Sequence, residues 1–163
     1  MQGELWIITG EIRAGKTRWC RMFLELAQKA GWDAAGVISP AVFENGQKVA
    51  IDALDVRSGE RRRLAARRQT EDPAQVHTRE WRFEADTIEW GNTVFRQAVP
   101  CDLLMVDEVG PLELLQGEGW SAALEAINSR AYRLAVVVVR PLLLPLAEKW
   151  QPQAVITVRN TIK

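Results

Sequence analysis

Eight residues near the N-terminus constrain this chain more than any other segment. Residues 10–17 read Gly-Glu-Ile-Arg-Ala-Gly-Lys-Thr, which satisfies the phosphate-binding pattern G-x-x-x-x-G-K-[ST] at every fixed position. The pattern follows a short apolar segment, residues 5–8, and precedes a stretch with helical periodicity, residues 17–30. Strand, loop and helix in that order are the context in which this pattern binds a nucleotide. The chain is therefore expected to bind nucleoside triphosphates.

The chemistry of the loop predicts what its residues do. Backbone N–H groups of the loop and of the following helix N-terminus would face phosphate oxygens, and the helix dipole would favour their negative charge. Lys16 would reach the β- and γ-phosphates, and the Thr17 hydroxyl would ligate Mg²⁺. The expected nucleotide-binding residues of this segment are Gly10, Glu11, Ile12, Arg13, Ala14, Gly15, Lys16, Thr17 and Arg18.

A second segment supplies the acids that such a site needs. Residues 103–106 are apolar and run directly into Asp107 and Glu108. A continuous apolar run is typical of a buried parallel strand, and open α/β sheets bind ligands beyond the carboxyl ends of their strands. Asp107 is expected to hold Mg²⁺ together with Thr17, and Glu108 to orient and deprotonate an attacking water. Gly110 is expected to permit a close backbone approach to the nucleotide.

The remaining periodicity predicts strands alternating with helices. Strands are expected at residues 35–38, 102–106, 134–139 and 155–158, and helices at residues 86–99, 118–130 and 142–150. Asn45-Gly46 is a strong hairpin signal, and turn residues recur at Ser58-Gly59, so residues 35–66 are predicted to form an antiparallel meander. Residues 67–80 are expected to form a polar loop. The fold class is a single doubly wound α/β domain with a mainly parallel sheet and an antiparallel β insertion.

Composition excludes some partners. The chain has 21 basic and 21 acidic residues, so no net charge draws it to nucleic acid or to a membrane. Cys20 and Cys101 have no partner at metal-ligand spacing, which indicates core thiols in a reducing compartment. The longest apolar stretch, residues 134–147, contains Arg140 and two prolines, so no membrane span is expected. With no leader-like segment before residue 5, the protein is predicted to be cytoplasmic.

These motifs resemble the THEP-type nucleoside-triphosphatases, small P-loop proteins. Besides the loop, residues 37–64 resemble the antiparallel insertion of that family, and residues 103–114 resemble its aspartate–glutamate–x–glycine segment. Residues 158–160 resemble its C-terminal end with the order changed, which adds Asn160 as a candidate nucleotide contact. The resemblance implies a RecA-like (ASCE) sheet and hydrolysis of several triphosphates, ATP and GTP included, with little base preference. The chain departs from the family at Ile12 and Arg13, where Pro and Gly are usual.

Three functions stay open at this stage. Adjacent Asp107 and Glu108 favour Mg²⁺-dependent hydrolysis of nucleoside triphosphates, because a carboxylate beside the metal ligand suits water activation. A kinase, with the meander or residues 67–80 as an acceptor lid, is the second, and a non-catalytic nucleotide-dependent accessory protein is the third. Arg13 and Arg140 are equal candidates for a residue that contacts the terminal phosphate.

Three further features of the sequence concern the surface and the core. Five arginines fall within residues 61–68, and they fit a solvated strand edge better than a nucleic-acid patch. His77 is the single histidine and is expected on the surface. The seven tryptophans are expected mostly in the core, and the sequence does not predict an oligomeric state.

Overall fold

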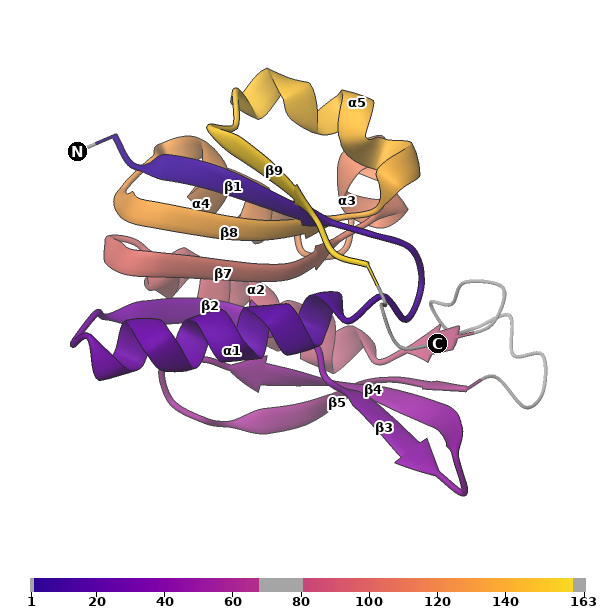
Figure 1. Ribbon diagram of the computed structural model, residues 1–163. Helices are drawn as coiled ribbons and strands as arrows, with labels where there is room; N and C mark the ends of the chain where they lie inside the picture. Colours follow the sequence, from indigo (N-terminus) through magenta and orange to yellow (C-terminus); the bar gives the residue numbers. More distant parts are fainter. Residues whose placement is uncertain (1, 68–80, 160–163) are drawn as a thin grey trace.

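A computed structural model describes residues 2–67 and 81–159 (Figure 1). Nine strands form one mixed sheet in the order β6-β5-β4-β2-β7-β8-β1-β9, with β3 paired to β4 alone. In chain order the elements are β1 (Glu4–Thr9), α1 (Lys16–Lys29), β2 (Ala34–Ile38), β3 (Ala41–Glu44), β4 (Gln47–Asp55), β5 (Arg61–Arg67), β6 (Trp81–Phe83), α2 (Ala85–Ala98), β7 (Cys101–Val109), α3 (Pro111–Gln116), α4 (Ser121–Ser129), β8 (Tyr132–Val139), η1 (Pro141–Leu143), α5 (Leu144–Ala147), η2 (Glu148–Trp150) and β9 (Ala154–Thr157).

Strands β2, β7, β8, β1 and β9 are all parallel to their neighbours in this series. Helix α1 lies in front of these strands in Figure 1, and α2 and α4 lie behind them. Because successive strand residues point to opposite faces, Leu103 and Met105 join the core under α1, whereas Leu104 and Val106 join the core under α2 and α4. The same alternation directs Asp107 toward the α1 face. Apolar patterning therefore sets which helix the functional acid meets.

The other half of the sheet is antiparallel, since β4 pairs in that sense with β2, β3 and β5, and β5 with β6. Asn45 and Gly46 form the two-residue connection between β3 and β4, with φ of 50° and 76°. Two successive positive φ values are what a tight hairpin of this kind requires, so the Asn-Gly prediction is confirmed. Residues 34–38, at the start of the predicted meander, form β2, which pairs antiparallel with β4 on one side and parallel with β7 on the other. The meander therefore begins on a strand that also belongs to the parallel half.

Several predicted boundaries are wrong. Strand β7 does not end before Asp107 but continues to Val109, which pairs with Val139 after an irregularity. The helix predicted to start at Asp86 starts at Ala85, with Glu84 before it and no side-chain cap. Strand β6 was not predicted, because three residues are too few to show a period. Residues 68–80, predicted as a loop, lie outside the described residues.

The C-terminal half differs from its prediction where glycine and proline interrupt the chain. The helix predicted over residues 118–130 begins at Ser121, and the short α3 before it was missed; Gly117 and Gly119, both with positive φ, separate the two. The helix predicted over residues 142–150 is instead three short pieces, η1, α5 and η2. Proline stands within the first two positions of both η1 and α5, where its missing N–H costs least.

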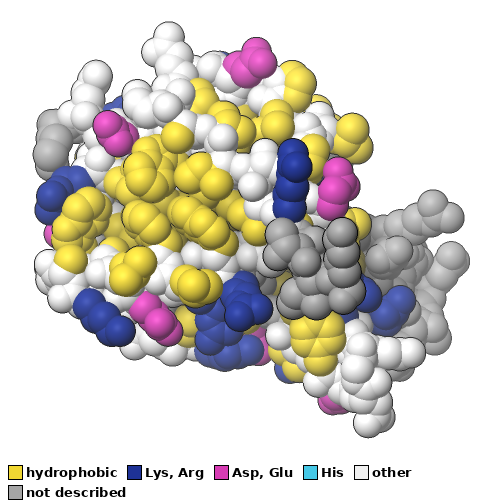
Figure 2. Space-filling model, in the orientation of Figure 1, with side chains coloured by type: hydrophobic (Ala, Val, Ile, Leu, Met, Phe, Trp, Pro, Cys, Tyr) yellow, Lys and Arg dark blue, Asp and Glu magenta, His cyan; other side chains and the backbone are white. Residues whose placement is uncertain are grey.

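Part of the α1 face remains open. Figure 2 shows a broad apolar area on the face that carries α1. Met22 and Leu26 on α1 and Val155 on β9 are exposed, and Trp6 and Phe23 are partly buried beside the core. Strand β9 has a single neighbour in the sheet, β1, so its outer edge is unpaired within the described chain. No helix of residues 2–67 or 81–159 has the length and apolar character needed to cross a membrane.

Candidate nucleotide site

The phosphate loop connects β1 to α1, at the carboxyl edge of the parallel strands. Gly15 precedes the helix in a left-handed conformation, with φ 97°. A Cβ on Gly10 would lie 2.4 Å from the carbonyl oxygen of Val158, so only glycine fits beside the segment that follows β9. The first turn of α1 begins at Lys16, and its N–H groups have no partners within a helix. These amides make the helix N-terminus suitable for an anion.

The loop and the acidic strand meet through Thr17 and Asp107. The Thr17 hydroxyl donates to Asp107 Oδ2 at 2.9 Å, across 90 residues of sequence. Ser39, which directly follows β2, donates its backbone N–H to the same oxygen at 3.2 Å and its hydroxyl to the Asp107 carbonyl oxygen at 2.5 Å. Ser39 was missed by the sequence interpretation. Its importance depends on β2 lying beside β7, which no local pattern reveals.

Asp107 is almost fully buried, with 3% of its surface exposed. Burial raises the pKa of its carboxyl, the hydrogen bonds from Ser39 and Thr17 lower it, and the nearby Glu108 charge raises it again; the result is a pKa of about 6. The positive charge of Lys16 also lowers this pKa, but no lysine or arginine of the described residues forms an ion pair with Asp107, so the carboxylate is incompletely neutralised. Asp107 therefore lies in a setting that a bound divalent cation would complete.

Glu108 faces two basic side chains. Arg140 Nε donates to Glu108 Oε1 at 2.9 Å, and Lys16 Nζ lies 3.8 Å from Glu108 Oε2. Lys16 Nζ also donates to the carbonyl oxygen of Gly10 at 2.8 Å. Strand β8 lies between β1 and β7, so Arg140, one residue beyond its end, is positioned at the same sheet edge as both motifs. Lys16 at the start of α1, Glu108 on β7 and Arg140 just beyond β8 thus meet at the ends of three neighbouring strands.

Lys48, on β4, is a further basic residue near the site. Burial lowers the pKa of Lys48, the negative charge of Glu108 raises it, the positive charges of Arg13 and Arg140 lower it, and Asp107 raises it; the net direction is down. Its ammonium lies 5.4 Å from the ring centroid of Trp81. Lys48 was not singled out from the sequence, because a lysine after a hairpin turn carries no distinctive pattern.

The other predicted residues are placed as follows. Glu11, Ile12 and Arg13 are exposed, and Ile12 is 81% exposed. This part of the loop would therefore contact phosphate through its backbone. Ala14 is buried, and its N–H donates to the carbonyl oxygen of Glu11. A Cβ on Gly110 would meet nothing closer than 3.8 Å, so no packing against the described chain requires glycine there. Asn160 and His77 lie outside the described residues.

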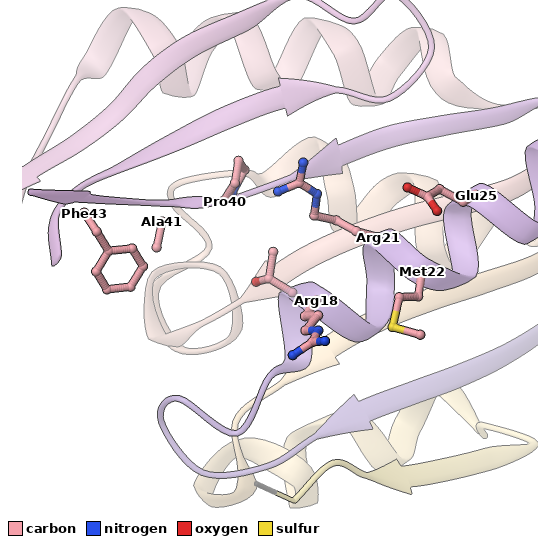
Figure 3. Close-up of a pocket in the computed structure, with 8 residues that line it drawn as sticks. Arg18, Arg21, Met22, Glu25, Pro40, Ala41 and Phe43 are labelled. Atoms are coloured by element: carbon pink, nitrogen blue, oxygen red, sulfur yellow. The ribbon is translucent and has the colours of Figure 1, made fainter. Parts of the chain in front are cut away.

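A groove of about 420 Å³ adjoins the Thr17 side of the site (Figure 3). Arg18, Arg21, Met22 and Glu25 line it from α1, opposite Pro40, Ala41 and Phe43. In Figure 3 the guanidinium of Arg21 reaches from the helix toward Pro40. Among the described residues, neither Arg18 nor Arg21 forms an ion pair with an acid, so the groove offers two cations beside apolar walls.

The arginine cluster lies away from this edge and is largely satisfied internally. Arg61 and Arg63 donate to the two oxygens of Asp52 at 2.8 and 2.6 Å, and Arg62 packs 4.8 Å from the ring centroid of Trp90. Strand β5 pairs with β6 only from Ala65 to Arg67, so Arg61, Arg62 and Arg63 lie where β5 has β4 as its single neighbour among the described strands, as the strand-edge prediction expected. Arg68 lies outside the described residues.

The donor set fits Mg²⁺. Two hard oxygens, the Thr17 hydroxyl and an Asp107 carboxylate, approach one another at 2.9 Å beside the phosphate loop. Within residues 2–67 and 81–159, no cluster of three or more His, Cys, Asp or Glu side chains forms a metal cage. Mg²⁺ usually takes one or two protein oxygens and completes its octahedron with water and substrate phosphate. Thr17 and Asp107 are therefore enough protein ligands for Mg²⁺.

The sequence is similar to those of archaeal nucleoside-triphosphatases called THEP1. The protein from Ignicoccus hospitalis is 32% identical over 133 residues, which cover 82% of this chain and 74% of the relative. The protein from Methanopyrus kandleri is 26% identical over 147 residues, which cover 88% of this chain and 79% of the relative.

Two solved structures share the fold. The solution structure of a human cancer-related nucleoside triphosphatase aligns with a TM-score of 0.72 at 17% identity, covering 96% of this chain and 88% of that protein. The crystal structure of THEP1 from Aquifex aeolicus aligns with a TM-score of 0.68 at 16% identity, covering 95% and 90%. The sequence also matches the model of the NTPase family over residues 6–161. This chain therefore belongs to the NTPase family.

Proposed function

We propose that this protein hydrolyses nucleoside triphosphates to the diphosphate and phosphate, with Mg²⁺ as cofactor. The observation that carries the proposal is the convergence of Lys16, Thr17, Asp107 and Glu108 at one sheet edge. The archaeal relatives are called nucleoside-triphosphatases, which agrees with this chemistry.

Each residue has a role that follows from its contacts. The amides of the loop and Lys16 would hold the β- and γ-phosphates, and Thr17 and Asp107 would hold the ion. The ion held by Thr17 and Asp107 would supply positive charge against the negative charge that develops on the phosphates. Glu108 would accept a proton from the attacking water. Water oxygen then bonds to the γ-phosphorus while the β–γ bridging bond breaks, and the diphosphate leaves.

The sheet order supports a finer assignment to the RecA-like (ASCE) class within a single domain. Strand β8 separates the loop-bearing β1 from the acid-bearing β7. That spacing leaves room between the two motifs for a water and for residues at the end of β8, and β3 to β6 would form the antiparallel insertion.

We also propose a cytoplasmic protein, because Cys20 and Cys101 are buried free thiols of the kind that reducing compartments preserve.

Base selectivity should be low. Val158 and Arg159 follow β9 beside Gly10, where a nucleoside attached to loop-bound phosphates would extend. Arg159 is exposed, and a flexible guanidinium can stack on any base. A fixed hydrogen-bonding pocket is what strong selectivity would need.

Phosphate release tests the proposal. Purified protein should release phosphate from ATP, GTP, CTP and UTP with Mg²⁺ and stop when EDTA is added. The kcat/KM values should fall within about a thousandfold of each other, or ~4 kcal/mol. Tight triphosphate binding without any release would leave only a binding function.

The groove beside Thr17 favours one second candidate, a phosphotransferase. Arg18 and Arg21 could hold an anionic acceptor whose apolar part contacts Phe43. Product analysis separates the two reactions, since a kinase would place the γ-phosphate of labelled ATP on an added nucleoside monophosphate instead of releasing it. Release unaffected by monophosphates would exclude this candidate.

A further inference from the structure

Arg140 contacts the residue that the proposed reaction needs as its base. Its Nε hydrogen-bonds Glu108 Oε1 at 2.9 Å, while Lys16 lies 3.8 Å from the other carboxylate oxygen. A water that loses its proton to Glu108 must itself hydrogen-bond to a carboxylate oxygen. The hydrogen bond from Arg140 takes one acceptor position of Oε1 and holds the carboxylate in one direction. Release of Arg140 would free that position for the water.

The position of Arg140 allows this movement. Its backbone is extended and precedes Pro141, which restricts it to that conformation, so the Cα is fixed at the end of β8. Its side chain is 53% exposed, and within the described residues Nε makes its one hydrogen bond. The two terminal nitrogens, the fork that binds carboxylate or phosphate oxygens in pairs, remain available. The guanidinium can therefore turn without breaking a network.

We propose that Arg140 restrains Glu108 in the nucleotide-free protein and moves to the terminal phosphate when a triphosphate binds. A γ-phosphate carries more negative charge than a carboxylate and presents three oxygens, so it competes effectively for the guanidinium. Glu108 is then released only when the phosphate to be transferred is present. Arg13 shows no such link, because it is exposed and forms no ion pair with a described acid. The inference rests on the proposed hydrolysis and adds a residue that couples substrate to base.

Binding measurements separate this role from a structural one. Affinities for a nucleoside diphosphate and for its non-hydrolysable β,γ-imido triphosphate are measured with Mg²⁺ on the wild type, Arg140→Gln and Arg140→Lys. Arg140→Gln should weaken triphosphate binding by about 10- to 100-fold, as for a lost charge-assisted contact, and change diphosphate binding by less than about twofold. Arg140→Lys should recover part of the loss. Equal weakening for both ligands would overturn the proposal.

A double-mutant cycle tests the exchange itself. If Glu108 competes with the phosphate for Arg140, Glu108→Gln should tighten binding of the imido triphosphate severalfold in the wild type. The same substitution should have no effect on affinity in the Arg140→Gln background. An identical effect in both backgrounds would mean that Glu108 acts on the nucleotide without Arg140, and the exchange would be wrong.

Arg133→Gln is the matched control. Arg133 lies on the same strand, 3.9 Å from Asp102 and 4.0 Å from the ring centroid of Trp32, outside the site. It should bind both ligands as the wild type does. Failure of the proposed function would be visible separately, as hydrolysis by Glu108→Gln at the wild-type rate. That result would leave the binding cycle, and with it the role of Arg140, to be decided on its own data.

Discussion

Two buried aspartates, Asp107 at the nucleotide site and Asp52 in the antiparallel strands, show how the two halves of this sheet treat charge. They are 3% and 8% exposed. Burial raises the pKa of Asp52, but hydrogen bonds and charge from Arg61 and Arg63 outweigh it, so the net pKa is lowered. Burial also raises the pKa of Asp107, and its nearest partners are a hydroxyl and a backbone amide, so its pKa stays raised at about 6.

The difference is one of partners rather than of depth. Asp52 has two cations on its two oxygens and needs nothing more. Asp107 is held in place by neutral donors that fix its direction without cancelling its charge. The nearest side-chain cations at this edge, Lys16 and Arg140, pair with Glu108 instead. A carboxylate oriented in this way can accept Mg²⁺ without first giving up a protein ion pair.

The largest expected effect concerns the neighbour of Asp107. Glu108→Gln removes the proton acceptor but keeps the size of the side chain, so turnover should fall about 10²- to 10⁴-fold. Triphosphate affinity should not weaken, because the loop, Thr17 and Asp107 are unchanged. Single-turnover hydrolysis and equilibrium binding at one Mg²⁺ concentration make the comparison. Asp52→Asn is the control, and its turnover should match the wild type.

Asp107→Asn should stabilise the metal-free protein. A folded-state pKa raised to about 6 means that stability from this group is full below its unfolded pKa near 4 and is lost as pH rises through 6. The loss corresponds to about 3 kcal/mol at neutral pH. An asparagine oxygen can still accept from Thr17 and Ser39 without that cost.

Urea unfolding with EDTA at pH 5 and pH 8 measures this effect. The gain from Asp107→Asn should be larger at pH 8, and Mg²⁺-dependent nucleotide binding should weaken in the same variant. A variant less stable than the wild type at pH 8 would show that Asp107 is a structural acid like Asp52.

Lys16→Ala should cost about 1.5–3 kcal/mol of triphosphate affinity, because one charge-assisted contact to phosphate is lost. Fluorescent-nucleotide titration measures it. Arg61→Ala, which removes a cation from the antiparallel half, is the matched control and should bind as the wild type does. Similar losses in both would mean that general positive charge, rather than the loop, attracts the nucleotide.

The sequence predicted the parts of the site that depend on local order. The loop, the apolar run before Asp107 and the Asn45-Gly46 hairpin are each contained in about ten residues, where spacing alone fixes the geometry. Arg140 directly follows the apolar run of residues 134–139, and it lies at the same sheet edge as Asp107 because parallel strands end together.

What the sequence did not predict depends on which strands are neighbours. Ser39 reaches Asp107 across 68 residues because β2 lies beside β7, and Lys48 approaches the site from the antiparallel strands. Such contacts result from the packing of the whole sheet and leave no pattern in any window. Short or interrupted elements, such as β6 and α3, were missed because they complete less than one or two periods.

Asp52→Asn should lower the free energy of unfolding by about 1 kcal/mol. The pairs with Arg61 and Arg63 are buried on the acid side, but both arginines are about half exposed, so solvent screens much of the interaction. Because the pKa of Asp52 is lowered, its contribution is present at neutral pH and is lost as pH falls through its folded pKa. Because the folded pKa lies below the ordinary value of 3.8, urea unfolding at pH 7 and at about pH 2.5 should show a smaller difference from the wild type at the lower pH. At pH 7, Asp52→Asn should thus destabilise the protein, whereas Asp107→Asn should stabilise it.

The smallest effect is expected at Arg13. This residue adopts a left-handed backbone conformation in the phosphate loop, whereas in the antiparallel half glycine or asparagine occupies such positions. Arg13 has φ 65°, a left-handed conformation that costs a side-chain-bearing residue about 1–2 kcal/mol. Arg13→Gly removes that cost but gives the unfolded chain more freedom, worth about 0.5–1 kcal/mol in the opposite direction. A net gain of about 0.5 kcal/mol should appear as a higher urea midpoint with an unchanged slope. Arg13→Ala keeps the strain while removing the guanidinium, so it should show no such gain.

If Arg13→Gly and Arg13→Ala lose turnover equally, the guanidinium itself acts on the nucleotide. If turnover is unchanged in both variants, the Arg13 guanidinium points into solvent and takes no part in catalysis. The cations of the site are then those on α1, on β4 and at the end of β8.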